Sequence, residues 1–292
     1  MLELEAHAKI NLGLDVIRKR EDGYHLVKMI MQSIRLHDVI SLEKNHSGEI
    51  RLTLEGSALP ADERNLAYKA AALMKKAYSI PDGISIHLKK QIPEAAGMAG
   101  GSTDAATVLI GMDRLFGLGL SKDVLLSHGL ELGADVPFCI LGGTCLSEGI
   151  GEILTPLPAM PSCYIVLVKP SQGVSTKEVY QALDKVPSPV HPPIDAQLED
   201  LKNGDLTSLC AHMGNILESV TLPLLPALNG RKSHLAALGA DGVLMSGSGP
   251  TIFGIFVQKD PAVHACQALK EVYPEDFIMV TEPCQPSNLV LQ

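Results

Sequence analysis

Apolar and polar residues alternate along several short stretches of the chain. Leu2, Leu4, Ala6 and Ala8 are separated by polar or charged residues, and the pattern runs on to Val16. A period of two residues is typical of a half-buried strand. Similar patterns and short apolar stretches predict further strands at residues 29–34, 38–43, 50–54, 84–88, 163–168, 243–245, 251–256 and 277–281. The N-terminal half is therefore expected to be β-rich and antiparallel in style.

Elsewhere the apolar residues recur at helical spacing, with polar residues at the expected starts. Asn65 precedes one such segment, which must end before Pro81, and Ser121 precedes another that ends near Gly133. Such residues cap helices by accepting hydrogen bonds from free N–H groups. The spacing predicts helices at about residues 65–78, 105–112, 121–133, 175–180, 206–218, 225–238 and 263–273. Strands and helices in these proportions indicate an α+β protein.

A run of small residues, Pro93 to Asp104, lies between the predicted strand at 84–88 and the helix that follows it. A glycine-rich turn that opens a helix directs several N–H groups to one point, where the helix dipole adds positive charge. Ser102, Thr103 or Asp104 is expected to cap the first turn. The run has no lysine at its end, so it is not a Walker A loop. Three glycines can also be simple turn residues, but a turn needs no run of small side chains, and we favour a phosphate site.

Composition narrows the choice of function. The chain has 292 residues, 46% of them hydrophobic, and a net charge of −9, which disfavours nucleic acid and anionic membranes as partners. The six cysteines form no C-x-x-C pair and are expected to be reduced core thiols. No signal peptide or membrane span is visible, so we expect a cytoplasmic protein. Prolines at 156, 158 and 161 suggest a boundary between domains at 1–155 and 156–292.

The glycine-rich run resembles the ATP-binding motif of the GHMP kinases, a family that includes galactokinase, homoserine kinase and mevalonate kinase. Met98 replaces the usual leucine and Ala99 a frequent glycine, which leaves a phosphate site possible. Asn65, Leu66 and Lys90 are similar to the family's adenine pocket, although Asn65 can also be a helix cap, and both roles can hold together. The resemblance implies ATP binding by Asn65, Leu66, Lys90, Pro93, Glu94, Ala95, Ala96, Gly97, Met98, Ala99, Gly100, Gly101, Ser102 and Thr103.

Two charged residues stand among apolar neighbours. Lys9 lies in the first strand pattern, where a lysine usually faces solvent, and Asp135 lies in Gly-Ala-Asp-Val-Pro-Phe, where it either caps a turn or needs a buried partner. Both segments resemble motifs of the same kinases. There the lysine lies beside the substrate hydroxyl and the aspartate is catalytic, so the resemblance implies catalytic roles for Lys9 and Asp135.

Further matches concern the substrate. Gly-Tyr-His at residues 23–25 resembles the segment that contacts cytosine in the branch of the family that phosphorylates a cytidine-diphosphate-linked methylerythritol. Met-Ser-Gly-Ser-Gly at 245–249 resembles the family's third motif, although a glycine-rich hairpin turn is an ordinary alternative. The resemblance implies substrate binding by Asn11, Tyr24, His25, Thr176, Tyr180, Gly247, Ser248 and Gly249.

The three motifs occur in order along nearly the whole chain. The resemblance implies a two-domain α+β GHMP kinase fold, with an N-terminal domain like ribosomal protein S5 domain 2 and a ferredoxin-like C-terminal domain. It also implies phosphorylation of the 2-hydroxyl of the cytidyl diphosphate substrate by ATP and Mg²⁺, in the non-mevalonate isoprenoid pathway. A homoserine or mevalonate type of GHMP kinase is an alternative, which Tyr24 and His25 disfavour. A non-catalytic nucleotide-binding protein is another, which Lys9 and Asp135 disfavour.

Overall fold

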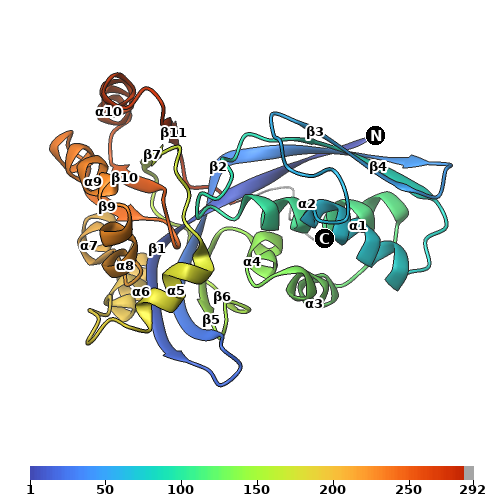
Figure 1. The fold of residues 1–292 in the computed structure, drawn as a ribbon, viewed down its shortest axis with the longest axis horizontal. Coiled ribbons are helices and arrows are strands. Elements are labelled where there is room, and N and C mark those ends of the chain that lie inside the picture. Colours follow the sequence, from blue (N-terminus) through green and yellow to red (C-terminus); the bar gives the residue numbers. More distant parts are fainter. Residues whose placement is uncertain (286–292) are drawn as a thin grey trace.

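A computed structural model describes residues 1–285 and shows two lobes joined by a long antiparallel hairpin (Figure 1). Its strands β1 and β2 pair along almost their full length and belong to a seven-stranded sheet of order β3-β4-β2-β1-β8, in which β5 pairs with β2 and β6. The strands of this sheet are β1 (Leu2–Lys19), β2 (His25–Asn45), β3 (Ile50–Glu55), β4 (Gly83–Lys89), β5 (Thr144–Glu148), β6 (Ile153–Pro156) and β8 (Gly214–Asn215).

Four helices of the first lobe pack together beside this sheet. They are α1 (Leu66–Ala77), α2 (Gly100–Phe116), α3 (Lys122–Leu132) and α4 (Val136–Leu141). Helix α2 is buried along most of its length and contacts both β1 and β2. A Cβ atom on Gly111 would lie 2.2 Å from the side chain of Leu42, so the glycine lets the helix backbone approach the sheet closely. This packing fixes the N-terminus of α2 in space.

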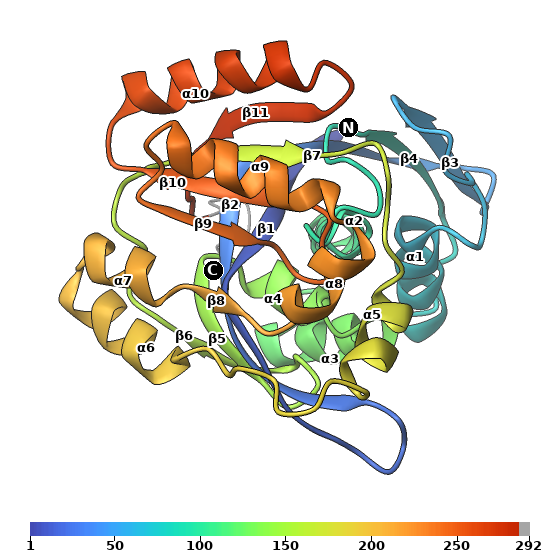
Figure 2. The same cartoon turned by 60° about the vertical axis from the view of Figure 1, so that its left-hand side comes forward.

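The second lobe contains a four-stranded antiparallel sheet of order β11-β7-β10-β9, with helices packed on it (Figure 2). Its strands are β7 (Tyr164–Lys169), β9 (Gly242–Met245), β10 (Ile252–Phe256) and β11 (Phe277–Thr281). The helices of this half are α5 (Thr176–Leu183), α6 (Ile194–Asn203), α7 (Leu206–His212), α8 (Glu218–Leu224), α9 (Ala227–Ala237) and α10 (Lys259–Val272). Helices α9 and α10 contact the sheet, in agreement with the expected α+β fold.

Three predicted elements differ from the structure. The strands expected at 29–34 and 38–43 are one continuous strand, β2, because it pairs with β1, β4 and β5 along its length. The helix expected at 206–218 is interrupted, since Gly214 and Asn215 add a short parallel strand to the edge of β1. The Asn215 side chain also donates hydrogen bonds to the carbonyls of Met245 and Gly247, at 2.8 and 2.7 Å. Tertiary pairing overrides the helical spacing here.

The expectation of reduced core thiols is met for five of the six cysteines. All six cysteines are free thiols, and five of them are buried. Among residues 1–285, the structure contains no helix with both the length and the apolar character needed to cross a membrane.

Candidate active site

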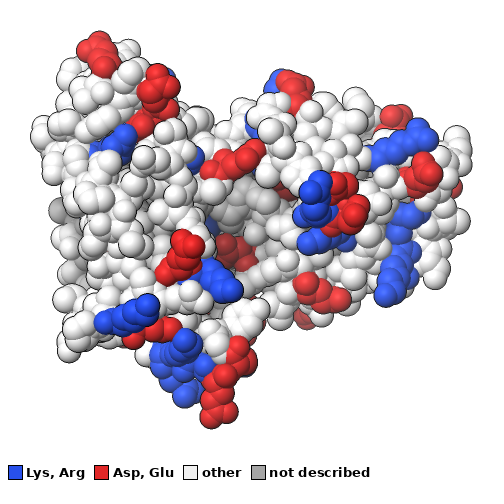
Figure 3. Space-filling model, in the orientation of Figure 1, with Lys and Arg blue, Asp and Glu red and all other residues white. Residues whose placement is uncertain are grey.

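A cavity with a volume of about 1070 Å³ lies between the two lobes. Figure 3 shows a hollow at this position, with acidic and basic side chains around it. Its wall is formed by β1, the tip of the β1–β2 hairpin, the glycine-rich run, the start of α4, helix α5 and the loop between β9 and β10. Segments more than 200 residues apart in sequence therefore share one cavity.

Helix α2 begins at Gly100 without a side-chain cap. Its capping position is Ala99, in the left-handed conformation with φ 57°, and alanine has no side-chain acceptor. The prediction that Ser102, Thr103 or Asp104 caps the first turn is wrong, because all three lie within the helix. The uncapped N–H groups of the first turn are thus left for another acceptor. They face the cavity, which is the arrangement that binds an anion at a helix N-terminus.

The two glycine clusters contact each other directly. Ser246 Oγ donates a hydrogen bond of 2.9 Å to the carbonyl of Gly97. Gly97 has φ +70°, and a Cβ atom there would lie 2.3 Å from the Ser246 carbonyl oxygen. A Cβ atom on Gly247, where φ is +58°, would lie 3.4 Å from Lys9 Nζ. Glycine is required at both positions by conformation and by close approach, and the contact brings the second lobe against the glycine-rich run.

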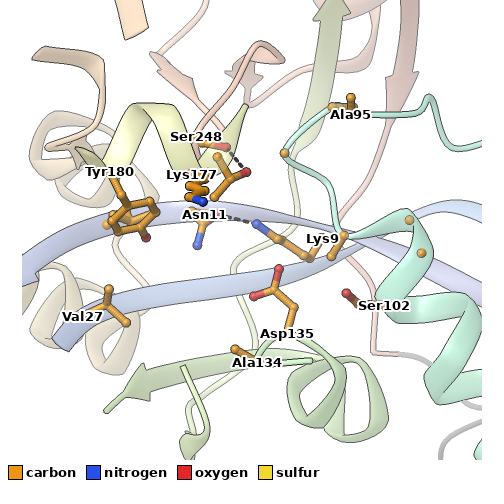
Figure 4. Close-up of a pocket in the computed structure, with 18 of the residues that line it drawn as sticks. Lys9, Asn11, Val27, Ala95, Ser102, Ala134, Asp135, Lys177, Tyr180 and Ser248 are labelled. Atoms are coloured by element: carbon orange, nitrogen blue, oxygen red, sulfur yellow. Dashed lines mark hydrogen bonds between the residues drawn. The ribbon is translucent and has the colours of Figure 1, made fainter. Parts of the chain in front are cut away.

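Lys9 is buried beside this contact, with 5% of its surface exposed. Its Nζ donates a 2.7 Å hydrogen bond to Oδ1 of Asn11, which is also buried. Burial lowers the pKa of Lys9, and the negative charge of Asp135 opposes that shift. Figure 4 shows Lys9 and Asp135 projecting into the same space from β1 and from the start of α4, with Ser102 nearby. The interpretation of Lys9 as a solvent-facing strand lysine is therefore wrong.

Asp135 occupies the capping position of α4, but its side chain makes no capping hydrogen bond. The carboxylate instead lines the cavity. Capping was the alternative explanation for an aspartate in this apolar segment, and the missing capping hydrogen bond excludes that explanation. The side chain is left available to a ligand.

Lys90 forms a buried ion-pair cluster just before the glycine-rich run. Its Nζ pairs with carboxylate oxygens of Asp38 and of Asp104, the latter at 2.7 Å, and its side chain is 4% exposed. The other oxygen of Asp38 accepts hydrogen bonds from the backbone N–H groups of Gln91 and Ile92, at 2.5 and 2.8 Å. This buried cluster fixes the chain as it enters the glycine-rich run. Lys90 borders the cavity, but its ammonium group already has two protein partners.

The same cluster predicts a pH dependence of stability. Burial, the largest effect, and the Asp38 carboxylate raise the pKa of Asp104 to about 8, against the attraction of Lys90. Between the unfolded value near 4 and the folded value, the native state keeps a proton that the unfolded state has lost. The free energy of unfolding should therefore fall with rising pH in this window, by at most about 1.4 kcal/mol per pH unit.

The Asp104→Asn variant lacks this titrating carboxyl group. Its free energy of unfolding should therefore fall less than that of the wild type between about pH 5.5 and about pH 8, as measured by urea unfolding. Asp195→Asn is the control, because the Asp195 side chain is 85% exposed. Equal pH dependence in the wild type and in Asp104→Asn would contradict the assignment.

At the far end of the cavity, a polar cluster surrounds His25. His25 Nε2 lies 2.7 Å from Asp184 Oδ1, and the Lys19 ammonium lies 2.6 Å from the other Asp184 oxygen. These two hydrogen bonds, that of His25 foremost, lower the pKa of Asp184. The Tyr180 ring lies against His25, with 5.1 Å between ring centres, whereas Tyr24 is 60% exposed at the hairpin tip. Aromatic and polar groups are thus combined at this end.

Most of the predicted site residues line the cavity, but four do not: Asn65, Met98, Thr103 and Gly249. Asn65 caps α1, accepting from Ala67 N at 2.9 Å, which confirms the capping role. Met98 and Thr103 are buried, and Met98 packs in the apolar core. Several further residues border or support the cavity without belonging to a predicted motif: Lys19, Asp22, Lys177, Gln181 and Asp184. No motif singles them out, since only the fold brings the hairpin tip against α5.

Two family models match the chain. The model of the GHMP kinases N terminal domain matches residues 65–143, and the GHMP kinases C terminal model matches residues 197–275. A homoserine kinase from Cytophaga hutchinsonii has the same fold, with a TM-score of 0.79, 21% identity, and coverage of 98% of this chain and 95% of its own. The GHMP kinase fold predicted from the motifs is confirmed.

More similar relatives narrow the group. A protein from Lachnospira eligens is 47% identical over 98% of this chain and 99% of its own, and one from Clostridium beijerinckii is 49% identical over 96% and 100%. Both are named 4-diphosphocytidyl-2-C-methyl-D-erythritol kinase. A crystal structure of 4-(cytidine 5'-diphospho)-2C-methyl-D-erythritol kinase matches with a TM-score of 0.82 and 37% identity, over 97% of this chain and all of the other. With its motifs, cavity and relatives in agreement, the chain belongs to the GHMP kinase family, in the group of the 4-diphosphocytidyl-2-C-methyl-D-erythritol kinases.

Proposed function

We propose that this enzyme transfers the γ-phosphoryl group of ATP to the 2-hydroxyl of 4-diphosphocytidyl-2-C-methyl-D-erythritol, a step of the non-mevalonate route to isoprenoid precursors. The observation that carries the proposal is the uncapped N-terminus of α2 beside Lys9 and Asp135, in one cavity. Phosphoryl transfer depends mainly on positioning and charge stabilisation, and these groups can supply both. We also propose that the chain divides into domains at 1–155 and 156–292.

The chemistry is assigned to two side chains. Asp135 accepts the proton of the attacking hydroxyl, because its carboxylate is free of capping bonds and faces the cavity. Lys9, held by Asn11, places positive charge beside that hydroxyl and beside the transferring group. Burial makes this charge more effective than it would be in water. The backbone N–H groups at the start of α2 hold the phosphates.

Mg²⁺ is expected to neutralise the β- and γ-phosphates, and the donor set fits it. Mg²⁺ takes oxygen ligands and usually binds to one or two protein groups as well as to phosphates and water. The Ser102 hydroxyl lines the cavity at the start of α2 and would be the protein ligand of Mg²⁺. Thr103, the next hydroxyl residue of α2, is buried with 2% exposure and does not line the cavity.

The nucleotide end is assigned to the cluster around His25. A carboxylate only accepts hydrogen bonds, so the Asp184 contact places a proton on His25 Nε2 and leaves Nδ1 of the neutral ring as an acceptor. An acceptor at this position matches the N4 amino group of cytosine and repels the O4 carbonyl of uracil. Stacking on Tyr24 and Tyr180 adds affinity of about 1–3 kcal/mol per base without selecting between bases.

This assignment predicts different effects for two neighbouring residues. Tyr24→Ala should raise KM for the cytidyl substrate but keep the preference over its uridyl analogue, since stacking does not distinguish the bases. His25→Ala should reduce the preference itself, because the group that discriminates is removed. The measurement is kcat/KM for both substrates in both variants. A wild-type enzyme that uses the uridyl analogue equally well would overturn the cytosine assignment.

The activity itself is tested with the purified full chain, ATP, Mg²⁺ and a panel of alcohols, scored by release of ADP. The proposal expects rapid release with 4-diphosphocytidyl-2-C-methyl-D-erythritol and little with homoserine or mevalonate. Faster release with either of the latter would favour another type of GHMP kinase. ATP binding without release for any alcohol would favour the non-catalytic alternative.

A further inference from the structure

A second cluster of polar side chains lies on the β1–β2 sheet, outside the kinase cavity. Glu5 and His7 are two residues apart on β1, so their side chains lie on the same face of the sheet. His37 on β2 is the direct cross-strand partner of His7. Strand pairing therefore presents two imidazoles and one carboxylate together.

The three side chains converge at short distances. One potential ligand atom from each lies within 4.8 Å of the others. Glu5 Oε2 is 3.1 Å from His7 Nε2, and Glu5 Oε1 is 3.8 Å from His37 Nε2. The side chains of His7 and His37 are 10% and 28% exposed, and that of Glu5 is 48% exposed, so the cluster is open to solvent on the Glu5 side.

The backbone fixes which nitrogen of each histidine faces the cluster. His7 Nδ1 lies 3.1 Å from the carbonyl oxygen of Ile34, and His37 Nδ1 lies 2.7 Å from that of Arg35. A carbonyl oxygen only accepts, so each Nδ1 carries a proton that it donates to the backbone. In neutral rings both Nε2 atoms then present lone pairs toward Glu5. Three acceptors face one another, which is unfavourable unless a cation, or a proton on one of the rings, lies between them.

We propose that Glu5, His7 and His37 bind a Zn²⁺ ion, with a water molecule as the fourth ligand. Two imidazole nitrogens and one carboxylate oxygen form a set that suits zinc and not Mg²⁺, which prefers oxygen ligands. Metal-binding histidines usually donate their second ring N–H to a backbone carbonyl or a carboxylate, as both histidines do here. Cys284 Sγ lies 3.6 Å from His7 Nδ1, on the opposite edge of that ring, and is not a ligand.

Bound zinc would clamp β1 to β2 next to the irregular register between His7 and Lys9. A ligand that binds only the native state stabilises it, so zinc should raise Tm, and the rise should grow with the logarithm of the free zinc concentration once that exceeds Kd. The site lies on the strand that carries the catalytic lysine, but zinc at this position takes no part in phosphoryl transfer.

The test uses the full chain, without a histidine tag and freed of metal by a chelator. Zinc is titrated calorimetrically and by its effect on Tm, for the wild type and for His37→Gln and Glu5→Gln. The matched control is His87→Gln, because His87 on β4 pairs with a single carboxylate, that of Glu55, at 3.5 Å. Tm in chelator reports whether each variant folds, and Glu5→Gln carries the test if His37→Gln does not fold.

We expect one zinc per chain in the wild type and in His87→Gln. The affinity should fall by more than about 10-fold in His37→Gln and Glu5→Gln, since loss of even an outer-shell partner typically costs 10- to 100-fold. Millimolar Mg²⁺ should not compete, and Co²⁺ bound in place of zinc should give the intense visible absorption of a tetrahedral site. The proposal would be overturned if the wild type showed no saturable zinc binding, or if His87→Gln and His37→Gln lost zinc affinity equally.

Discussion

Replacing Asp135 with asparagine is expected to lower kcat by about 10²–10⁴-fold, the usual contribution of a general base. Asparagine has nearly the same size but cannot accept the proton of the attacking hydroxyl. The side chain makes no capping hydrogen bond, so the fold should tolerate the change. Steady-state kinetics give kcat, and calorimetry with ATP should give nearly unchanged binding.

Asp195→Asn is the control for Asp135→Asn, because Asp195 pairs with Lys28 on the surface and does not line the cavity. Its kcat should equal that of the wild type. An Asp135→Asn enzyme with wild-type kcat would mean that the aspartate has only a structural role. Another group would then have to take the proton.

Replacing Gly101 with valine is expected to weaken ATP binding by about 10-fold or more. The substituent would lie at the start of α2, in space assigned to phosphates, and each lost hydrogen bond to a charged group costs about 1.5–3 kcal/mol. The fold should persist, since among residues 1–285 the nearest atom outside the helix backbone is a methyl carbon of Leu66, 3.4 Å from the new Cβ. Isothermal titration with ATP gives the affinity, and Tm reports folding.

Gly230→Val is the matched control for Gly101→Val. Gly230 lies within α9, away from the cavity, and its Cβ would lie 3.3 Å from the Tyr273 hydroxyl. It should bind ATP as the wild type does. Gly100→Val would be a less specific test of the phosphate site than Gly101→Val, because a Cβ atom on Gly100 would lie 3.1 Å from Ile92 and 3.4 Å from Lys90 Nζ. Wild-type ATP affinity in folded Gly101→Val would contradict the phosphate assignment.

The sequence predicted most elements because their signals are local. Periods of two and 3.6 residues depend on neighbours along the chain, and so do caps such as Asn65 and Ser121, both of which accept the expected backbone hydrogen bonds. The glycine-rich run was also identifiable, since a strand, a turn of small residues and a helix follow each other directly. The motifs at Lys9, Asp135 and Gly247 indicated one family because each motif is a short, continuous segment of the chain.

Only the tertiary structure decided what these residues contact. Burial of Lys9, the missing cap at Asp135 and the double pairing of Lys90 depend on neighbours from other elements. His25 and Asp184 are 159 residues apart, and no local pattern encodes their contact. The helix predicted across Gly214 does not form there, because Gly214 and Asn215 pair with the edge of β1 instead. Local propensity is worth about 1 kcal/mol or less per residue, so packing and pairing between distant segments override it wherever the two disagree.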